Sequence, residues 1–247
     1  MELEGKVALV TGGAVRIGRA ICEALAAEGC DVVIHCRRSA AQARALAARL
    51  RRRGVRSWVV RLDLRGQRDC ERLLRRAWSA AGGVDCLINN AAVFHKDALA
   101  TTTERTLLAE LRTNLFVPVL LTRAFAARGR RGQVVNLLDR RIATRDPACV
   151  PYMLSKQGLA EFTRLAALAL APRIAVNGVA PGAILPPPGT GGRRVRDRAG
   201  AVPLGRQVTP ADVAAAVVTL LKMDAVTGQI MFVDGGQHLL GSGGTEA

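Results

Sequence analysis

Short apolar runs alternate with longer amphipathic stretches along almost the whole chain. The short runs predict strands, and the longer stretches, with apolar residues at helical spacing, predict helices. Strict alternation of the two predicts an α/β fold, a doubly wound parallel sheet of about seven strands with helices on both faces. The predicted strands are 7–10, 31–35, 58–62, 86–89, 133–138, 174–179 and 230–233, and the predicted helices are 17–28, 40–53, 69–80, 103–127, 152–170 and 210–222.

One late stretch, residues 185–205, breaks this alternation. Its prolines and glycines exclude a regular helix or strand over that length, and a group of arginines follows them. Loops this long in compact domains are often functional, so we expect a lid over a substrate site, with a plain loop as the alternative.

The length and composition favour one globular domain. A chain of 247 residues can bury a full core. No apolar run approaches the roughly 20 residues that cross a bilayer, and residues 1–6 do not resemble a secretory signal. The six cysteines form no Cys-x-x-Cys pair and the three histidines do not cluster. We therefore expect no metal site, no disulfide framework and a cytoplasmic location.

The net charge of +16 comes almost entirely from arginines dispersed along the predicted helices. Aromatic residues make up 3% of the chain, which leaves little to stack on nucleic-acid bases. We therefore expect a solvated basic surface and no nucleic-acid partner. Long-range attraction of polyanionic ligands is the alternative.

A glycine-rich turn, residues 11–18, joins the first predicted strand to the first predicted helix. Such glycines let a backbone approach a pyrophosphate at the positive end of a helix. An NAD site would place an acid after the second strand, but here the chain reads Arg37, Arg38 and Ser39. Two guanidinium groups and a hydroxyl can hold a 2′-phosphate, so we predict NADPH as the cofactor. Ordinary solvated charges at Arg37 and Arg38 are the alternative.

Tyr152 is the only tyrosine, and Lys156 lies four residues downstream on the same predicted helix. This spacing places both side chains on one face. A free phenol has a pKa of about 10, and a nearby ammonium would lower that pKa and allow proton exchange with a substrate. We expect an acid–base pair, although Tyr-x-x-x-Lys alone is common on amphipathic helices.

Together the motifs resemble the short-chain dehydrogenase/reductase family over nearly the whole chain. The resemblance implies a single Rossmann-like NADPH-binding domain over residues 1–247 that acts on a small-molecule substrate as a homotetramer. The motifs that carry it are the turn at 11–18, Asp63-Leu64, Asn89-Asn90-Ala91-Ala92, Asn114, Tyr152 with Lys156, Pro181-Gly182 and Asp234-Gly235-Gly236.

The resemblance also implies individual roles. Asp63 and Leu64 would border the adenine, Pro181 and Gly182 would line the nicotinamide end, and Asn114 would hold a water molecule of a proton relay. The complete set expected at the cofactor is Gly12, Arg16, Ile17, Gly18, Arg37, Arg38, Ser39, Asp63, Leu64, Asn89, Asn90, Ala91, Lys156, Pro181 and Gly182. The expected catalytic set is Asn114, Asp139, Tyr152 and Lys156.

Two departures from the family pattern are informative. The family usually has a serine after the fifth strand, where this chain has Asp139, and the glycine-rich turn carries Arg16. Both features resemble the pteridine reductase branch, as do the Arg38–Ala41 string and Phe94.

The chemistry of these residue types suits a pterin. The carboxylate of Asp139 can accept hydrogen bonds from the amino and ring N–H groups, or hold a proton if burial raises its pKa. Phe94 would stack on one side of the flat ring, and Arg16 would contact either cofactor phosphate or the pterin edge. The alternatives are a solvated Asp139, a packing role for Phe94, a surface charge at Arg16, and neutralisation of Asp139 by Arg140 or Arg141.

The leading hypothesis is therefore NADPH-dependent reduction of a pteridine C=N bond, with Arg16, Phe94, Asp139 and Tyr152 at the substrate. The second hypothesis is a carbonyl reductase that acts on a 3-oxoacyl thioester, and the missing serine counts against it. The third hypothesis is a non-enzymatic NADPH- or polyanion-binding protein, and the presence of Tyr152, Lys156 and Asn114 counts against it.

Overall fold

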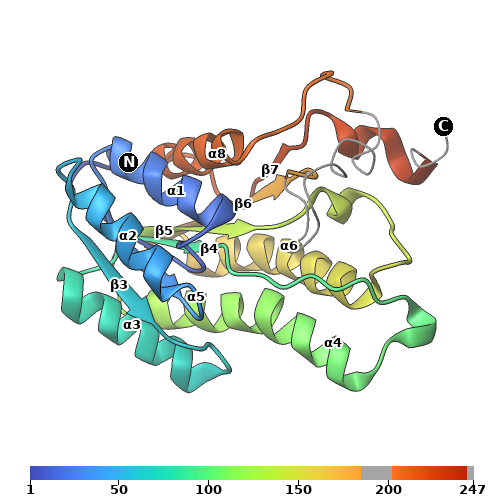
Figure 1. Ribbon diagram of the computed structural model, residues 1–247, viewed down its shortest axis with the longest axis horizontal. Helices are drawn as coiled ribbons and strands as arrows, with labels where there is room; N and C mark the ends of the chain where they lie inside the picture. The colour runs from blue at the N-terminus through green and yellow to red at the C-terminus, as the bar shows by residue number, and fades with distance from the viewer. Residues whose placement is uncertain (185–201, 244–247) are drawn as a thin grey trace.

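The computed structural model describes residues 1–184 and 202–243 and contains one sheet of seven parallel strands (Figure 1). The strand order is β3-β2-β1-β4-β5-β6-β7. This confirms the predicted doubly wound α/β fold, and each predicted run corresponds to a strand. The strands are β1 (Val7–Val10), β2 (Asp31–Cys36), β3 (Ser57–Arg61), β4 (Cys86–Asn89), β5 (Gly132–Leu137), β6 (Ile174–Pro181) and β7 (Ile230–Val233).

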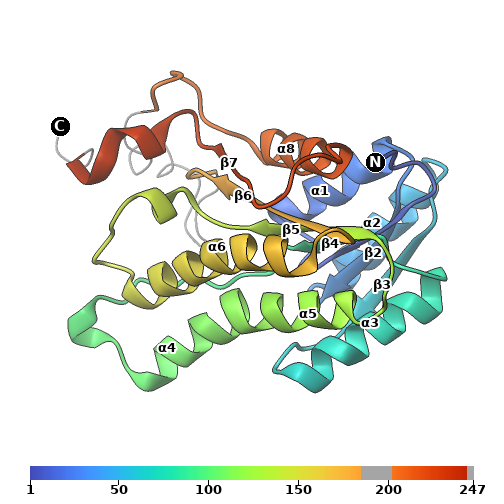
Figure 2. The ribbon, with the colours of Figure 1, turned by 180° about the vertical axis from the view of Figure 1, so that it is seen from behind.

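Helices cover both faces of the sheet, as Figures 1 and 2 show from opposite sides. One layer consists of α1 (Arg16–Ala27), α2 (Ala40–Arg51) and α8 (Pro210–Lys222). The other consists of α3 (Gln67–Ala81), α5 (Val117–Ala126) and α6 (Val150–Leu170).

Two hydrophobic cores fill the space between the sheet and these layers. Ala8 and Val10 of β1 belong to the core under α1, α2 and α8, whereas Val7 and Leu9 belong to the opposite core. Successive side chains of a strand point to opposite faces, so a strand buried on both faces must be apolar at every position. This is why the strands stand out in the sequence as continuous apolar runs.

The predicted helix 103–127 divides into three consecutive segments: α4 (Glu104–Leu111), a π-helical turn (Arg112–Phe116) and α5. Thr103 caps α4, because its hydroxyl accepts a hydrogen bond from the Thr106 N–H at 3.2 Å. The wider π-helical turn contains Asn114. Such turns are rare and often occur at functional sites.

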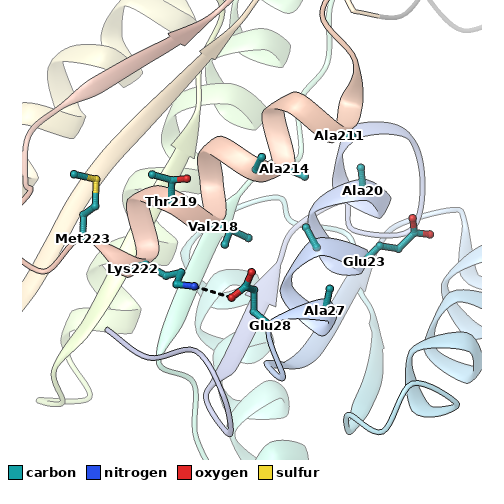
Figure 3. Close-up of a pocket in the computed structure, with 12 residues that line it drawn as sticks. Ala20, Glu23, Ala27, Glu28, Ala211, Ala214, Val218, Thr219, Lys222 and Met223 are labelled. Carbon is teal, nitrogen blue, oxygen red and sulfur yellow. Dashed lines mark hydrogen bonds and ion pairs between the residues drawn. The ribbon is translucent and has the colours of Figure 1, made fainter.

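The strand order reverses between β1 and β4, where ligands of doubly wound folds bind at the carboxyl ends of the strands. A separate groove of about 700 Å³ lies between α1 and α8 (Figure 3). Alanines form much of its lining, and Lys222 donates to Glu28 across it at 2.8 Å. None of the predicted site residues lines this groove.

All six cysteines are free and buried. Within residues 1–184 and 202–243, no helix is both long and apolar enough to span a membrane. The same residues contain no group of three or more side chains that could hold a metal ion. Most of the predicted lid, residues 185–201, lies outside the described residues. The end of the predicted segment is described, and the N–H of Leu204 donates to the Gly235 carbonyl at 3.1 Å.

Candidate active site

The turn after β1 has a backbone that only glycine fits at two positions. Gly12 has a φ of +62°, in the left-handed region. A Cβ on Gly18 would lie 2.3 Å from the carbonyl oxygen of Gly12. Arg16 begins α1 with a φ of +54°, which is uncommon for a residue with a side chain, and its side chain is exposed. The next residue, Ile17, packs against the core and anchors α1.

Hydrogen bonds tie this turn to the end of β4. The hydroxyl oxygen of Thr11 accepts from the N–H groups of Asn90 at 2.9 Å and Ala91 at 3.0 Å. The Asn90 side-chain amide donates to the carbonyls of Thr11 at 2.8 Å and Gly12 at 3.2 Å. These bonds join the two strands at which the order reverses, so they fix the ends of β1 and β4 relative to each other.

His35, at the end of β2, supports the same turn from the other side. Its Nδ1 accepts from the N–H of Gly12 at 3.3 Å, so the ring proton lies on Nε2 and is donated to the Leu62 carbonyl at 3.0 Å. Burial lowers the pKa of His35, which favours this neutral form. The sequence analysis missed His35, because a lone histidine in a strand gives no functional signal.

The predicted phosphate-binding arginines lie at the same edge of the sheet. Arg37 and Arg38 follow β2 and are exposed, and Ser39 precedes α2 without a side-chain capping bond. Arg37 lies 3.7 Å from the carboxylate of Asp63, which follows the neighbouring strand β3. Leu64 is half-buried against the core below.

A second group of side chains lies where β5 meets α6. The Tyr152 hydroxyl donates to Asp139 Oδ2 at 2.9 Å, and the Lys156 ammonium donates to the Leu137 carbonyl at 2.6 Å. Tyr152 and Lys156 are buried, with 7% and 3% of their surfaces exposed, and the side chain of Asp139 is 16% exposed. The predicted acid–base pair and Asp139 are thus adjacent, and the alternative of a solvated Asp139 is wrong.

The expectation that the pKa of Tyr152 is lowered is wrong for this arrangement. Burial raises the pKa of Tyr152 well above its usual value, and the negative charge of Asp139 raises it further. Lys156 Nζ lies 5.8 Å from the centre of the tyrosine ring and is bonded to the backbone, whereas the Asp139 carboxylate contacts the phenol oxygen itself. Burial in turn lowers the pKa of Lys156 to about 8, against the charges of Asp139 and Glu110.

Arg141, not Arg140, is the partner of Asp139. Its backbone N–H donates to Asp139 Oδ1 at 2.9 Å, and its guanidinium lies 3.4 Å from Oδ2. The same guanidinium lies 5.4 Å from the centre of the Phe94 ring. Phe94 in turn meets Tyr152 edge-on, with ring centres 4.8 Å apart and planes at 90°. Phe94 is 37% exposed, so it borders the site and is not part of the core.

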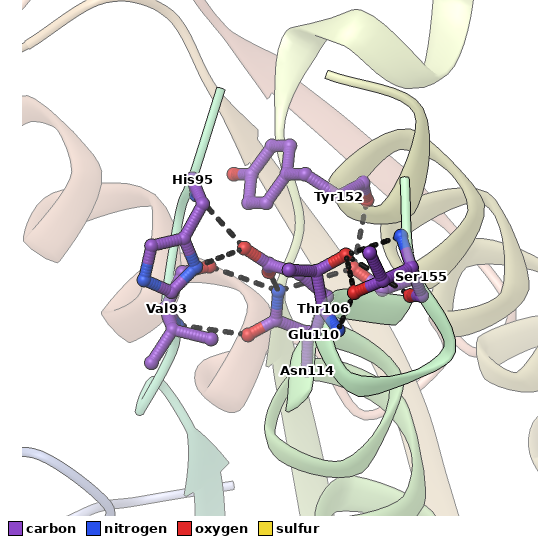
Figure 4. A network of polar contacts seen from close by, with 8 residues as sticks. Val93, His95, Thr106, Glu110, Asn114, Tyr152 and Ser155 are labelled. Atoms are coloured by element: carbon purple, nitrogen blue, oxygen red, sulfur yellow. Dashed lines mark hydrogen bonds and ion pairs between the residues drawn. The ribbon is translucent and has the colours of Figure 1, made fainter. Parts of the chain in front are cut away.

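Asn114 joins the loop after β4 to α6 (Figure 4). Its Oδ1 accepts from the N–H of Val93 at 2.9 Å. Its amide lies within hydrogen-bond distance of the Val93 carbonyl at 3.0 Å, Glu110 Oε2 at 2.7 Å and Ser155 Oγ at 3.1 Å. The side chain is fully buried and these contacts hold it in place. The proton-relay water implied for Asn114 stays a prediction.

Asn89 lies below the site and not at its surface. It is buried, and its amide donates to Asn136 Oδ1 at 2.8 Å on the paired strand. Pro181 is buried at the end of β6. A Cβ on the next residue, Gly182, would lie 2.9 Å from the Cα of Asp234, so this close approach of two chain segments requires glycine.

The assembled site combines three chemical capacities. Tyr152 has a proton that it can donate, Asp139 has acceptor oxygens beside it, and Phe94 has an aromatic ring whose centre lies 4.8 Å from that of Tyr152. The sequence analysis missed Glu110, His95 and Ser155, since a carboxylate or hydroxyl on a helix usually indicates a solvated position.

Comparison with known proteins identifies several relatives. A sequence profile described as enoyl-(acyl carrier protein) reductase matches residues 13–238. Crystal structures of FolM alternative dihydrofolate reductase 1 from Brucella canis and from Brucella suis, each in complex with NADP, are 35% identical to this chain, with TM-scores of 0.91 and coverage of 96% of both chains. The protein named granaticin polyketide synthase putative ketoacyl reductase 2, from Streptomyces violaceoruber, is 36% identical over 252 residues, covering 96% of this chain and 98% of that protein.

The pKa of Tyr152 can be tested directly because it is the only tyrosine in the chain. Replacing Asp139→Asn removes the negative charge beside the phenol, so the pKa of Tyr152 should fall relative to the wild type. The measurement is a pH titration of tyrosinate absorbance. Asp139→Glu keeps the charge and should keep the pKa high. Identical titrations for the wild type and Asp139→Asn would contradict the interaction.

Proposed function

Because the chain belongs to the short-chain dehydrogenase/reductase family, we propose that it is an NADPH-dependent enzyme that reduces the C=N bond of a pteridine, such as a dihydropteridine or dihydrofolate. The observation that carries this proposal is the hydrogen bond of 2.9 Å from Tyr152 to Asp139, where the family usually has a serine. A serine can polarise a carbonyl oxygen, but a carboxylate offers acceptors to the N–H groups of a nitrogen heterocycle.

The residues of this chain fit NADP(H) as the cofactor. Gly18 lets the turn pack closely against the start of α1, since a Cβ there would lie 2.3 Å from the carbonyl oxygen of Gly12, and the first N–H groups of the helix can bind a pyrophosphate. Arg37, Arg38 and Ser39 follow β2 and provide donors for a 2′-phosphate. Bound NADPH supplies the hydride for the C=N carbon, and the protein supplies the orientation and the proton.

Tyr152 donates its proton to the ring nitrogen that becomes N–H. Donation leaves a buried phenolate beside Asp139, and the raised pKa of Tyr152 makes that state unfavourable. The proton must therefore be replaced promptly. Lys156 suits this task because burial lowers its pKa to about 8, which makes its proton easier to release than that of an exposed lysine.

Asp139 and Phe94 orient the substrate. The Asp139 oxygens accept from the amino and ring N–H groups of the pterin, and Arg141 keeps the carboxylate in place through its backbone N–H at 2.9 Å. Phe94 forms one wall of the site and packs against the flat ring. Arg16 stands at the start of α1 for contact with cofactor phosphate or the pterin edge.

A ketone-reducing enzyme is the alternative, favoured by the similarity to the granaticin ketoacyl reductase. The two functions differ in what Asp139 must do. A ketone oxygen needs a donor and gains nothing from a carboxylate, whereas a pterin needs the acceptor.

NADPH oxidation with a dihydropteridine, dihydrofolate and a 3-oxoacyl thioester distinguishes the two functions. We expect turnover of the pteridines, and Asp139→Ser should lower their kcat/KM by about 10- to 100-fold, the effect of losing a hydrogen bond to a charged group. Asp139→Ser should leave any thioester reduction unchanged or faster. Turnover of the thioester alone, or equal losses for both substrates, would contradict the proposal.

The NADPH preference has its own test. Replacing both Arg37→Ala and Arg38→Ala removes the donors for the 2′-phosphate, so NADPH affinity should fall by about tenfold or more while NADH affinity stays unchanged. Arg164→Ala, on the exposed face of α6, is the matched control. Binding can be followed by NAD(P)H fluorescence, without any substrate. An equal loss for both nucleotides would show that the arginines do not read the phosphate.

We also propose that the enzyme is a homotetramer, supported by an apolar surface on α6. Leu154, Leu165 and Leu168 are exposed by 52%, 58% and 82%, and Phe116 of the π-helical turn by 43%. Exposed apolar groups of this kind often mark subunit contacts.

The double variant Leu165→Glu, Leu168→Glu should disrupt that assembly, because it would bury charges in an apolar contact. Light scattering after size-exclusion chromatography should give a smaller mass than for the wild type. Ala80→Glu, an exposed position on α3, should keep the wild-type mass. A wild-type protein that is already monomeric would contradict the assembly.

A further inference from the structure

Phe94 belongs to a three-residue segment, Val93-Phe94-His95, that follows β4 without regular structure. A loop of this kind does not by itself fix the direction of an aromatic side chain. Phe94 nevertheless lies edge-on to Tyr152, with the two ring centres 4.8 Å apart and the ring planes at 90°. Contacts on both sides of Phe94 explain how this orientation is held.

On one side, Asn114 holds the backbone of Val93. Its Oδ1 accepts from the Val93 N–H at 2.9 Å, and its amide donates to the Val93 carbonyl at 3.0 Å. A side-chain amide paired with both polar groups of one residue acts like a neighbouring strand. This contact fixes the chain directly before Phe94.

On the other side, Glu110 holds His95. Its Oε1 accepts from the backbone N–H of His95 at 2.8 Å and from the imidazole Nδ1 at 2.8 Å. Its Oε2 accepts from the amide of Asn114 at 2.7 Å. Figure 4 shows Glu110 between His95 and Asn114, with Tyr152 close to the same cluster. Glu110 and Asn114 are four residues apart, so successive turns of the helical segment carry the two clamps.

The buried carboxylate of Glu110 requires hydrogen-bond donors around it. Its carboxylate is 1% exposed, and a buried charge is costly unless hydrogen bonds and a partner compensate it. The donors that compensate it come from His95 and Asn114, which flank the proposed substrate wall. The imidazole of His95 is 64% exposed, so the packing of the core does not require this side chain.

We propose that Glu110 and His95 are positioning residues that lock Phe94 against Tyr152 and thereby set the width of the substrate site. The lock consists of the Glu110 carboxylate, the His95 imidazole and the backbone of residues 93–95, which Asn114 holds at Val93. That the wall contacts a pteridine rests on the proposed function, whereas the lock itself does not. Neither residue contacts the reacting atoms.

The single tyrosine provides a direct probe of the lock. Incorporated 3-fluorotyrosine reports only on Tyr152, and its ¹⁹F NMR signal is sensitive to the neighbouring Phe94 ring. Phe94→Leu should shift this signal and thus defines the shift expected when the aromatic contact is lost. The experiment uses the full chain without substrate.

His95→Leu removes the imidazole donor at an exposed position and should move the ¹⁹F signal toward that of Phe94→Leu. His95→Asn places an amide N–H close to the position of Nδ1 and should restore the wild-type signal. Lys96→Leu, an exposed neighbour, should leave the signal unchanged. Glu110→Gln should act like His95→Leu. It replaces one of the two acceptor oxygens of Glu110 with an NH₂ group, which would then face a donor of His95 or Asn114.

Kinetics gives a second readout. In His95→Leu, the KM for the substrate that undergoes reduction should rise by about tenfold with little change in kcat. In His95→Asn, KM should return most of the way to the wild-type value. NADPH affinity should stay unchanged in both variants. A general structural defect would instead lower kcat and cofactor binding together.

The proposed lock is wrong if Phe94→Leu does not move the ¹⁹F signal. It is wrong as well if Phe94→Leu moves the signal but His95→Leu leaves it at the wild-type position. It is also overturned if His95→Asn behaves like His95→Leu. Failure of the pteridine function alone would appear as the expected ¹⁹F shifts without pteridine turnover, so the two failures are distinguishable.

Discussion

The hydrogen bond from the Tyr152 hydroxyl to Asp139 connects the end of β5 to the start of α6 and defines the centre of the site. It places a proton donor and a carboxylate side by side in surroundings that exclude most water. Burial and the carboxylate raise the pKa of Tyr152, so the phenol is protonated at neutral pH. The other side chains act around this contact. Arg141 holds Asp139, and the Lys156 ammonium anchors to the last carbonyl of β5.

The architecture explains why residues far apart in the sequence lie together at one edge of the sheet. Parallel strands direct their carboxyl ends to one edge of the sheet, and the reversal between β1 and β4 opens a crevice at that edge. A hydrogen bond between Thr11 and Asn90 joins the ends of these two strands, and His35 supports the glycine-rich turn from β2. Backbone groups therefore form most of the half of the site that we propose for the cofactor. Side chains form the half that we propose for the substrate.

The two halves differed in how much of them could be predicted. Strand positions were predicted closely because burial on both faces makes a strand apolar throughout, as β1 illustrates. The glycine-rich turn and Asp139 were noticed because they follow a pattern or depart from one. The π-helical turn was not predicted, since the residues around Asn114 have ordinary helical periodicity. The direction of the Tyr152 pKa shift was predicted wrongly, because spacing along a helix does not tell how deeply a phenol is buried or which charged group contacts it.

The α/β fold, the order of its elements and the residue types at each strand end follow from the amino-acid sequence alone, because they depend on local periodicity and on the burial of apolar groups. Which polar and charged groups meet depends on how the chain packs. Arg141 and not Arg140 meets Asp139, and Glu110 is buried against His95 and Asn114 in place of facing solvent. Electrostatic and hydrogen-bond interactions act over a few ångströms in three dimensions, so they depend on how the loops after β4 and β5 pack against α4 and α6.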